Sequence, residues 1–215
     1  MPWLEQLQSA DWSEAGWIAL AAYVLGCFTT GYYLVRFRTG QDLREVGSGS
    51  VGARNVGRLL GWRGFVLTAL GDFGKGALAV WAARHFTMDD TICTLALLAV
   101  VAGHVWPVQL CFRGGKGVAT ALGALLFYDW QLALVFVVLF AGAFAVLRRT
   151  ILPGLFALAC LPLASAYLAR GETEVAGTTA LAGLVLIAHR RNLMSEFSNF
   201  VEHRNVHPKH DSPEA

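Results

Sequence analysis

The chain has 215 residues, of which 55% are hydrophobic and only 15% are charged, and its mean hydropathy is positive. This composition excludes an ordinary soluble domain and favours a membrane protein. The formal net charge of +2 says little about partners, and we expect no nucleic-acid partner. The four cysteines show neither a close pair nor metal-ligand spacing, so we expect no metal site.

Apolar runs recur along nearly the whole chain. They cover residues 17–37, 65–83, 91–112, 118–128, 130–147, 151–169 and 175–188. Most are near the ~20 residues that span a bilayer as a helix, although 118–128 is short for a span. The first run has no Lys or Arg before it, so the chain lacks the basic start of a cleaved signal peptide. We therefore predict an all-α integral membrane protein with seven transmembrane helices, of which the fourth is short.

The basic residues predict the orientation of these helices. If all seven runs cross and the N-terminus is outside, 14 of the 17 Lys and Arg residues are cytoplasmic; Arg84 and Arg170 are outside and Lys75 is within a span. This arrangement satisfies the positive-inside rule. Without a crossing at 118–128, the basic residues would be split between the two faces. The predicted parts are an extracytoplasmic segment (1–16), a membrane domain (17–202) and a disordered cytoplasmic tail (203–215).

The predicted topology places three unusual segments on the cytoplasmic face, and the first is residues 47–61, GSGSVGARNVGRLLG. Its glycines let backbone N–H groups approach an anion. Arg54 and Arg58 share a face if a helix begins after Ala53, so both could reach one phosphate. The alternative is a solvated loop whose arginines enforce topology or touch lipid head groups.

The second segment is residues 103–120, GHVWPVQLCFRGGKGVAT. His104 lies near the cytoplasmic end of the third span, and Pro107 loosens the helix there by removing a backbone donor. Three glycines then bracket Lys116 in a tight turn before the next apolar run, where an ammonium is well placed to bind a phosphate. His104 alone is open to a structural interpretation as a helix-facing hydrogen bonder.

The third segment is residues 189–192, HRRN, at the end of the last span. His189 and Asn192 are one helical turn apart and point to the same side, where they could orient hydroxyls or phosphate oxygens. Asp72 and Lys75, spaced i to i+3 in the second span, are an intramembrane ionisable pair. They either neutralise each other or take part in the site.

These segments resemble motifs of the bacterial acyl-phosphate-dependent glycerol-3-phosphate acyltransferases of the PlsY type. Members carry GSGN-x-GATN-x-x-R, GH-x-x-P…F-x-GGKGVAT and HR-x-N, which stand here as GSGSVGARNVGR, GHVWPVQLCFRGGKGVAT and HRRN. The resemblance covers residues 31–192. It implies a multi-pass enzyme of the bacterial inner membrane whose active site faces the cytoplasm. The implied reaction transfers a fatty acyl group from acyl phosphate to the 1-hydroxyl of glycerol 3-phosphate, giving lysophosphatidic acid and phosphate for phospholipid synthesis.

The resemblance also implies which residues form the site. The catalytic set is Ser48, Arg58, Lys116 and His189, and the substrate-binding set is Gly47, Gly49, Arg54, Asn55, His104, Gly114, Gly115, Gly117, Thr120 and Asn192. Arg58 and Lys116 would hold phosphate groups, and Ser48 would hydrogen-bond one of them. His189 and Asn192 would position the glycerol phosphate. No cofactor is expected, because acyl phosphate is a co-substrate; the other expected partners are glycerol 3-phosphate and membrane lipid, and an enzyme that supplies acyl phosphate is a further candidate.

Departures from the family pattern leave the acceptor open. Ser50 stands where the family usually has Asn, Arg54 where it usually has Thr, and Ser195 takes a usual Arg position. A paralogue that acylates another alcohol or phospho-alcohol is therefore the second hypothesis. An organic-phosphate transporter is the third, although the outer halves of the spans are nearly all apolar. A non-catalytic lipid head-group binder is the fourth, and it would bind anions without turnover.

Overall fold

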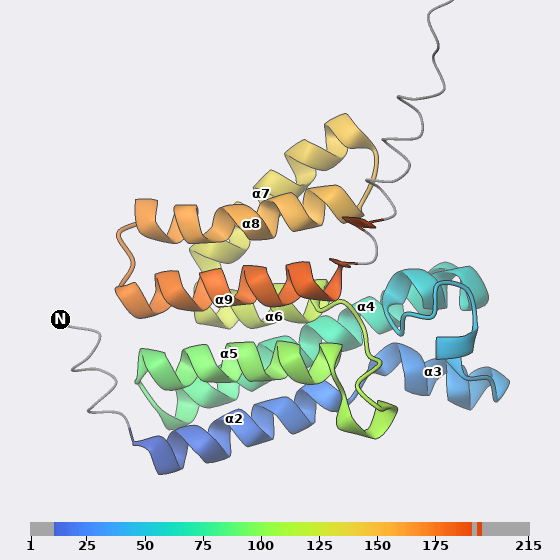
Figure 1. Cartoon of the computed structure of the whole chain (residues 1–215), viewed down its shortest axis with the longest axis horizontal. Helices are drawn as coiled ribbons and strands as arrows, with labels where there is room; N and C mark the ends of the chain where they lie inside the picture. Colours follow the sequence, from blue (N-terminus) through green and yellow to red (C-terminus); the bar gives the residue numbers. More distant parts are fainter. Residues whose placement is uncertain (1–10, 191–192, 195–215) are drawn as a thin grey trace, which may run out of the picture.

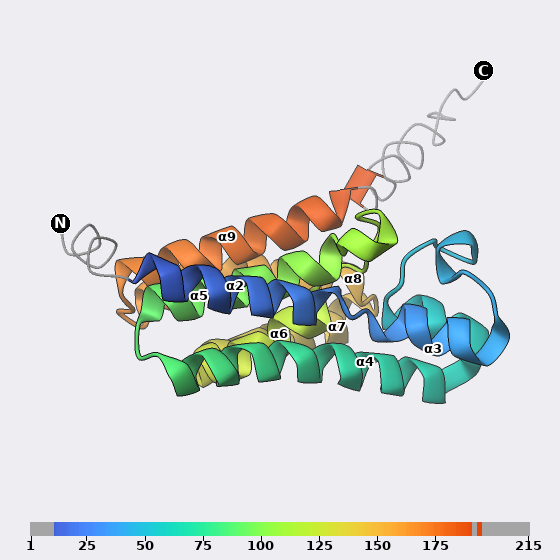
Figure 2. The same cartoon turned by 90° about the horizontal axis from the view of Figure 1, so that it is seen from below.

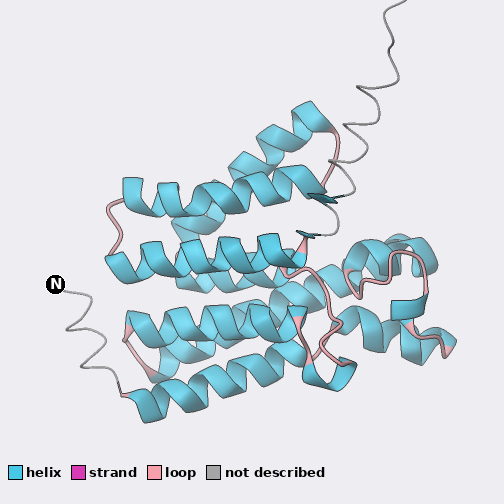
Figure 3. Ribbon diagram, viewed as in Figure 1, coloured by secondary structure: helices cyan, strands magenta, loops and turns pink. Residues whose placement is uncertain are grey.

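A computed structural model gives the fold, and it describes residues 11–190, 193 and 194. Within these residues all regular secondary structure is helical (Figure 3). The α-helices are α2 (Trp12–Cys27), α3 (Thr30–Thr39), α4 (Ala53–Phe86), α5 (Asp90–Val105), α6 (Val118–Tyr128), α7 (Trp130–Leu147), α8 (Ile151–Tyr167) and α9 (Glu172–Ala188), and two 3₁₀ turns are η1 (Leu43–Glu45) and η2 (Val108–Leu110).

The helices run back and forth along one long axis, so the connecting loops gather at two opposite ends of the bundle (Figure 1). Four helical stretches are long and apolar enough to cross a membrane, namely Trp12–Thr39, Ala53–Phe86, Asp90–Leu110 and Trp130–Leu147. Val118–Tyr128 and Ile151–Tyr167 are shorter apolar helices. The prediction of an all-helical membrane protein is confirmed in this respect.

The first predicted span, 17–37, is not one helix. Phe28 and Thr29 are extended between α2 and α3, with φ of −69° and −90°. A break at membrane depth frees backbone carbonyls that need new donors. Here the Gln109 side chain donates a hydrogen bond to the carbonyl of Cys27, and a buried lysine bonds the carbonyls on either side. The sequence offered no Pro or Gly at the break to predict it.

The second and third predicted spans also have different ends. The second begins at Ala53 instead of residue 65, and it bends at Gly61, whose φ of 71° is a conformation that favours glycine. The third ends at Val105 instead of residue 112, because Pro107 follows and cannot continue the helical hydrogen bonding. The earlier start of α4 puts Arg54 and Arg58 in its first turns, and the earlier end of α5 leaves the glycine-rich turn outside a helix.

Close helix crossings hold the short helix α6 in the bundle. Gly76 of α4 lies against the backbone of Thr120, and Gly123 of α6 lies against the carbonyl of Phe73, so a Cβ at either glycine would overlap the facing helix. Small residues allow such close packing where water does not drive association. The helix α6 contacts α4, α5 and α7 and lies inside the bundle (Figure 2). Its neighbours therefore cover most of this 11-residue helix, and its exposed large apolar side chains are Leu126 and Phe127.

The sides of the bundle are apolar both inside and outside. The core is formed mainly by aliphatic side chains, including Leu97, Leu125 and Leu181, which are fully buried. Large apolar side chains such as Trp17 and Trp130 are exposed instead, at 70% and 63% of their surface. Exposed apolar surface of this extent indicates contact with lipid rather than with water.

The loops at the end opposite the predicted site carry two arginines in ion pairs. Nη1 of Arg84 lies 2.7 Å from Oδ1 of Asp90, and Nε of Arg170 lies 2.7 Å from Oδ2 of Asp129. These two arginines are the ones that the charge pattern placed outside. Both are neutralised by a neighbouring carboxylate, so this end presents little free positive charge.

Candidate active site

Asn55 organises the loop that precedes α4. Its Nδ2 donates hydrogen bonds to the carbonyls of Val46 (2.8 Å), Ser50 (3.0 Å) and Leu43 (3.3 Å), while its Oδ1 accepts one from the backbone N–H of Ser48 (3.0 Å). The residue is only 3% exposed. The side-chain amide of Asn55 thus makes all its hydrogen bonds inside the loop, and the residue shapes the loop. The sequence had suggested instead that this side chain contacts a ligand.

The loop displays Ser48 at its surface between two glycines. Gly47 and Gly49 have φ of 61° and 69°, in the left-handed region that favours glycine, and a Cβ at Gly47 would overlap Oδ1 of Asn55. Ser48 itself is exposed. Its hydroxyl is therefore free to meet a ligand at the start of α4.

Two arginines extend from the first turns of α4. Helix α4 begins at Ala53, so Arg54 and Arg58 lie four residues apart on one face, and both are exposed. Gly52 caps the helix without a side-chain hydrogen bond. The first N–H groups of α4 and the positive end of its dipole add to the two guanidinium groups, which makes this helix end attractive to an anion.

The glycine-rich turn after η2 folds back onto the end of α5. The N–H of Gly115 donates to the carbonyl of His104 (3.0 Å), and that of Gly114 donates to Val105 (3.1 Å). A Cβ at Gly115 would overlap the Nε2 edge of the His104 ring, so only glycine fits. Lys116 follows, half-buried, and Gly117 caps α6 with a φ of 81°. The turn thereby packs directly on the His104 ring and carries Lys116 as its next residue.

Electrostatic interactions show that this turn lies close to the start of α4. Partial burial lowers the pKa of Lys116 below its usual range, and the positive charges of Arg54 and Arg58 lower it further. Three cations therefore repel one another in the absence of a ligand. A bound phosphate would relieve this repulsion, which makes the cluster a candidate phosphate site.

His189 brings the end of α9 to the same place. Burial lowers its pKa, a hydrogen bond to the Val185 carbonyl partly offsets this, and the positive charge of Lys116 lowers the pKa further. The ring is thus neutral at neutral pH. Its Nδ1 lies 2.9 Å from that carbonyl, which can only accept, so Nδ1 carries the proton and Nε2 keeps a lone pair. The three sequence segments meet at one end of the bundle (Figure 1).

Asp72 and Lys75 form a buried ion pair beside His104. Nζ of Lys75 lies 3.3 Å from Oδ1 of Asp72 and 2.8 Å from Nδ1 of His104. The three residues are 3–5% exposed. The sequence left open whether the ion pair belongs to the site, and the structure places it directly behind His104.

Arg44 is an organising residue that the sequence did not single out. Its Nη1 donates to the carbonyl of Leu110 (2.9 Å), which joins the loop before α4 to the loop after α5. Its hydrogen bonds to Asp42 are the largest cause of a fall in the pKa of that carboxyl to about 2. Nothing in the pattern of the loop distinguishes Arg44 from the neighbouring topology-setting arginines.

One predicted substrate-binding residue, Thr120, does not present its side chain to the cluster. Thr120 is fully buried at the crossing of α6 with Gly76, and its hydroxyl has no hydrogen-bond partner among the described residues. It packs between helices, so the prediction that it binds substrate is not supported. Asn192 lies outside the described residues.

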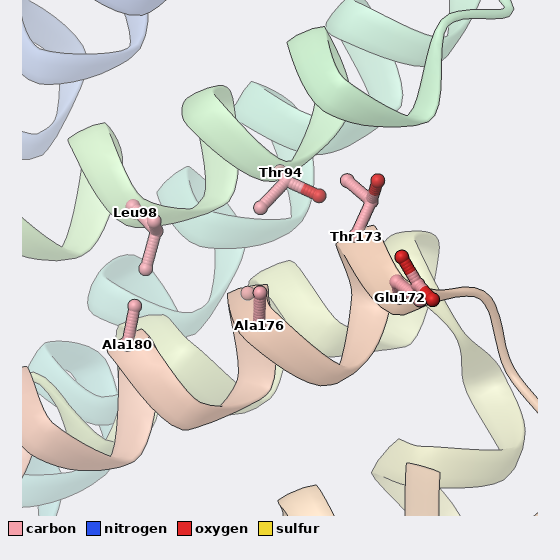
Figure 4. A pocket seen from close by; sticks show the side chains of 7 residues that line it. Thr94, Leu98, Glu172, Thr173, Ala176 and Ala180 are labelled. Atoms are coloured by element: carbon pink, nitrogen blue, oxygen red, sulfur yellow. The ribbon is translucent and has the colours of Figure 1, made fainter. Parts of the chain in front are cut away.

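A separate pocket lies between α5 and α9, near the N-terminal ends of both helices. It has a volume of about 450 Å³, and its lining is mainly apolar but includes the polar side chains of Thr94, Glu172 and Thr173 (Figure 4). His104 and His189 lie at the C-terminal ends of the same helices. The pocket is therefore remote from the cationic cluster.

Together, the fold and the cluster define a helical integral membrane protein with a candidate anion site at one end. The family model described as glycerol-3-phosphate acyltransferase matches residues 16–198. Glycerol-3-phosphate acyltransferase 1 of Desulfitobacterium hafniense (strain Y51) is 47% identical over 184 residues, covering 84% of this chain and 91% of the relative. The glycerol-3-phosphate acyltransferase of Synechococcus sp. (strain CC9902) is 40% identical over 171 residues, covering 80% and 86%.

Solved structures agree with this assignment. The crystal structure of PlsY, an integral membrane glycerol 3-phosphate acyltransferase, in its glycerol 3-phosphate form has a TM-score of 0.80 and 34% sequence identity, covering 86% of this chain and 92% of that chain. Its lysophosphatidic acid form gives a TM-score of 0.77. The chain belongs to the glycerol-3-phosphate acyltransferase family.

Proposed function

We propose that this protein transfers a fatty acyl group from acyl phosphate to the 1-hydroxyl of glycerol 3-phosphate, forming lysophosphatidic acid and inorganic phosphate. The observation that carries the proposal is the meeting of Arg54, Arg58, Lys116 and His189 at one end of an apolar bundle. Both substrates carry phosphate, and the cations suit phosphate binding. Family membership supports the same activity.

We further propose that α2 with α3, and each of α4 to α9, crosses the bacterial inner membrane, with the N-terminus outside and the site in the cytoplasm. The two arginines at the opposite end are paired with carboxylates, whereas Arg54 and Arg58 are exposed at the site end. The positive-inside rule favours the cytoplasm for the end with free basic residues.

The chemistry follows from the charges around the reacting carbonyl. The 1-hydroxyl oxygen of the acceptor bonds to the acyl carbon, the bond from that carbon to the phosphate oxygen breaks, and phosphate leaves with the bonding electrons. Negative charge builds on the carbonyl oxygen and the leaving phosphate, and Arg58, Lys116 and the hydroxyl of Ser48 are placed to stabilise it. Acyl phosphate already has a good leaving group, so the site supplies positioning and charge stabilisation.

His189 is best placed to receive the hydroxyl proton. Its Nδ1–H is committed to the Val185 carbonyl, so Nε2 can only accept a hydrogen bond while the ring is neutral. An acceptor aligned with a hydroxyl can orient it and take its proton as the new ester bond forms. The phosphate oxygens of the substrates are the alternative proton acceptors.

Arg54 favours a second candidate, a related acyltransferase with a different anionic acceptor. Its charge contributes to the lowered pKa of Lys116, so it adds positive potential within the cluster. A more anionic phospho-alcohol would gain most from that extra charge. Competition between glycerol 3-phosphate and other phospho-alcohols for the same acyl phosphate distinguishes the two candidates.

The donor and the product provide the direct test. Purified protein is given glycerol 3-phosphate with either palmitoyl phosphate or palmitoyl-coenzyme A, and lipids are identified by mass spectrometry. The proposal predicts 1-palmitoyl lysophosphatidic acid with palmitoyl phosphate and none with the thioester. Product formed only from the thioester, or no product with any phospho-alcohol, would contradict it.

A further inference from the structure

The buried ion pair behind His104 has a hydrogen-bonding pattern that determines where the imidazole carries its proton. Nζ of Lys75 lies 2.8 Å from the carbonyl oxygen of Gly26, 2.7 Å from that of Phe28 and 2.8 Å from Nδ1 of His104. A charged ammonium has three N–H bonds and no lone pair. These are its three shortest contacts, and because the ammonium has no lone pair, Nδ1 of the histidine must accept from it.

Charge balance supports the ionised form of Lys75. Oδ1 of Asp72 lies 3.3 Å from Nζ and 3.6 Å from Nδ1 of His104. With Asp72 and Lys75 both ionised and the imidazole neutral, the buried cluster has no net charge, whereas neutralising either partner would leave a lone charge in an apolar bundle. Asp72 also accepts from the backbone N–H of Thr30 (3.3 Å), which further favours its anionic form.

The tautomer that results directs a donor toward the glycine-rich turn. A neutral imidazole that accepts at Nδ1 carries its proton on Nε2. The Nε2 edge of His104 packs against Gly115, next to Lys116, and within the described part of the chain no acceptor is bonded to it. An N–H without a protein acceptor, at a turn that also carries Lys116, is suited to a phosphoryl or carbonyl oxygen of a bound substrate.

We propose that Lys75 is a positioning residue, which fixes His104 in the tautomer that presents an Nε2–H donor to substrate oxygen at the 114–117 turn. Asp72 keeps Lys75 charged and thereby acts in the same direction. The proposal rests on the proposed acyl transfer, but its central element, the tautomer, is measurable without turnover.

The same lysine also stabilises the break between α2 and α3. The carbonyls of Gly26 and Phe28 flank that of Cys27, which is bonded by Gln109. Removal of Lys75 would therefore disturb both the break and the histidine. Gln109 offers a matched control, because its side chain bonds a carbonyl at the same break and its described hydrogen bonds go to Cys27 and Tyr33, not to His104.

Nitrogen-15 NMR of histidine-labelled protein in lipid nanodiscs tests the tautomer, with His104→Gln used to assign the resonance. The wild-type protein should show an Nε2-protonated, Nδ1-unprotonated ring for His104. Lys75→Met should change that pattern toward a tautomer mixture, and Gln109→Met should not. An Nδ1-protonated His104 in the wild-type protein would overturn the proposal, whether or not the protein catalyses acyl transfer.

A double-mutant cycle then tests whether Lys75 acts through His104. In His104→Gln, an amide N–H stands near the position of Nε2 without needing Lys75. Lys75→Met should lower kcat by about 10-fold or more in the wild-type background, in the range of a lost proton-positioning group, and by much less in the His104→Gln background. An equal loss in both backgrounds, with Gln109→Met matching it, would show that Lys75 only supports the helix break.

Discussion

Nε2 of His104 and Nε2 of His189 have opposite hydrogen-bonding roles. The first carries a proton because Nδ1 of His104 accepts from Lys75, and the second is a lone pair because Nδ1 of His189 donates to the Val185 carbonyl. One ring can therefore donate to a substrate oxygen while the other accepts from a hydroxyl. A site that joins a charged acyl donor to an alcohol can use both kinds of group.

Lys116→Ala should abolish transfer and leave the protein folded. The ammonium is half-buried in a turn and repelled by two arginines, so its loss removes a phosphate ligand without opening the core. We expect at least about a 100-fold fall in kcat/KM, in the range for losing a group that stabilises developing charge. Arg113→Ala, an exposed cation three residues earlier, is the matched control and should retain activity. A similar loss of activity in both variants would show that the total positive charge of this region matters, and not a specific phosphate contact of Lys116.

Glycerol 3-phosphate should bind less tightly once the pH rises through the lowered pKa of Lys116. The pKa of Lys116 lies below its usual value in the free protein, and the charge of a bound phosphate favours the ammonium. The ammonium is lost as the pH rises through that lowered pKa, so KM should increase. Lys116→Arg keeps its charge at every accessible pH and should show a flat KM over the same range. Steady-state kinetics from pH 6.5 to 9.5 measure the difference, and parallel profiles would contradict this role of Lys116.

The same pKa has a consequence for stability without substrate. The folded protein binds fewer protons at Lys116 than the unfolded chain, in which the pKa is 10.5. The folded protein should therefore become more stable as the pH rises from the lowered pKa of Lys116 toward 10.5, because the half-buried ammonium loses its charge. Thermal unfolding in detergent should show a smaller rise in Tm with pH for Lys116→Met than for the wild-type protein.

Asn55→Ala should release the loop before α4. The change leaves the carbonyls of Leu43, Val46 and Ser50 without their donor, and a lost buried hydrogen-bond group costs about 1–3 kcal/mol. Activity should fall because Ser48 is no longer held. Hydrogen exchange of residues 43–50 should increase while that of α5 stays unchanged. Unaltered protection of the loop would show that Asn55 does not organise it.

Gly115→Ala should inactivate the enzyme by displacing the His104 ring, since its Cβ would overlap Nε2. Gly142→Ala is the control, because a Cβ there meets nothing within 4 Å. That control replaces a helical glycine and should keep full activity with a Tm equal to or above that of the wild type. Activity assays and thermal unfolding of both variants separate a local steric effect from a general intolerance of alanine.

The sequence predicts the helical membrane class because long apolar runs have few other solutions in lipid. It also identifies most of the cluster, since Arg58, Lys116 and His189 lie in the polar segments that stand between or directly after apolar runs. It does not predict the break at Phe28 and Thr29, because that break is stabilised by side chains distant in sequence.

The sequence also does not predict the direction in which a side chain points. Asn55 and Thr120 lie in the right motifs, yet Asn55 points into its own loop and Thr120 into a helix crossing. Both orientations depend on tertiary contacts, with backbone carbonyls in the first case and with Gly76 in the second.

Release of inorganic phosphate from palmitoyl phosphate, measured with and without glycerol 3-phosphate in the wild-type protein and in Lys116→Ala, tests the central claim most directly. The cationic cluster predicts release by the wild-type protein that depends on glycerol 3-phosphate, and a loss of that release in Lys116→Ala. Phosphate release that does not depend on glycerol 3-phosphate, or that persists unchanged in Lys116→Ala, would contradict the claim that this cluster is the acyltransferase site.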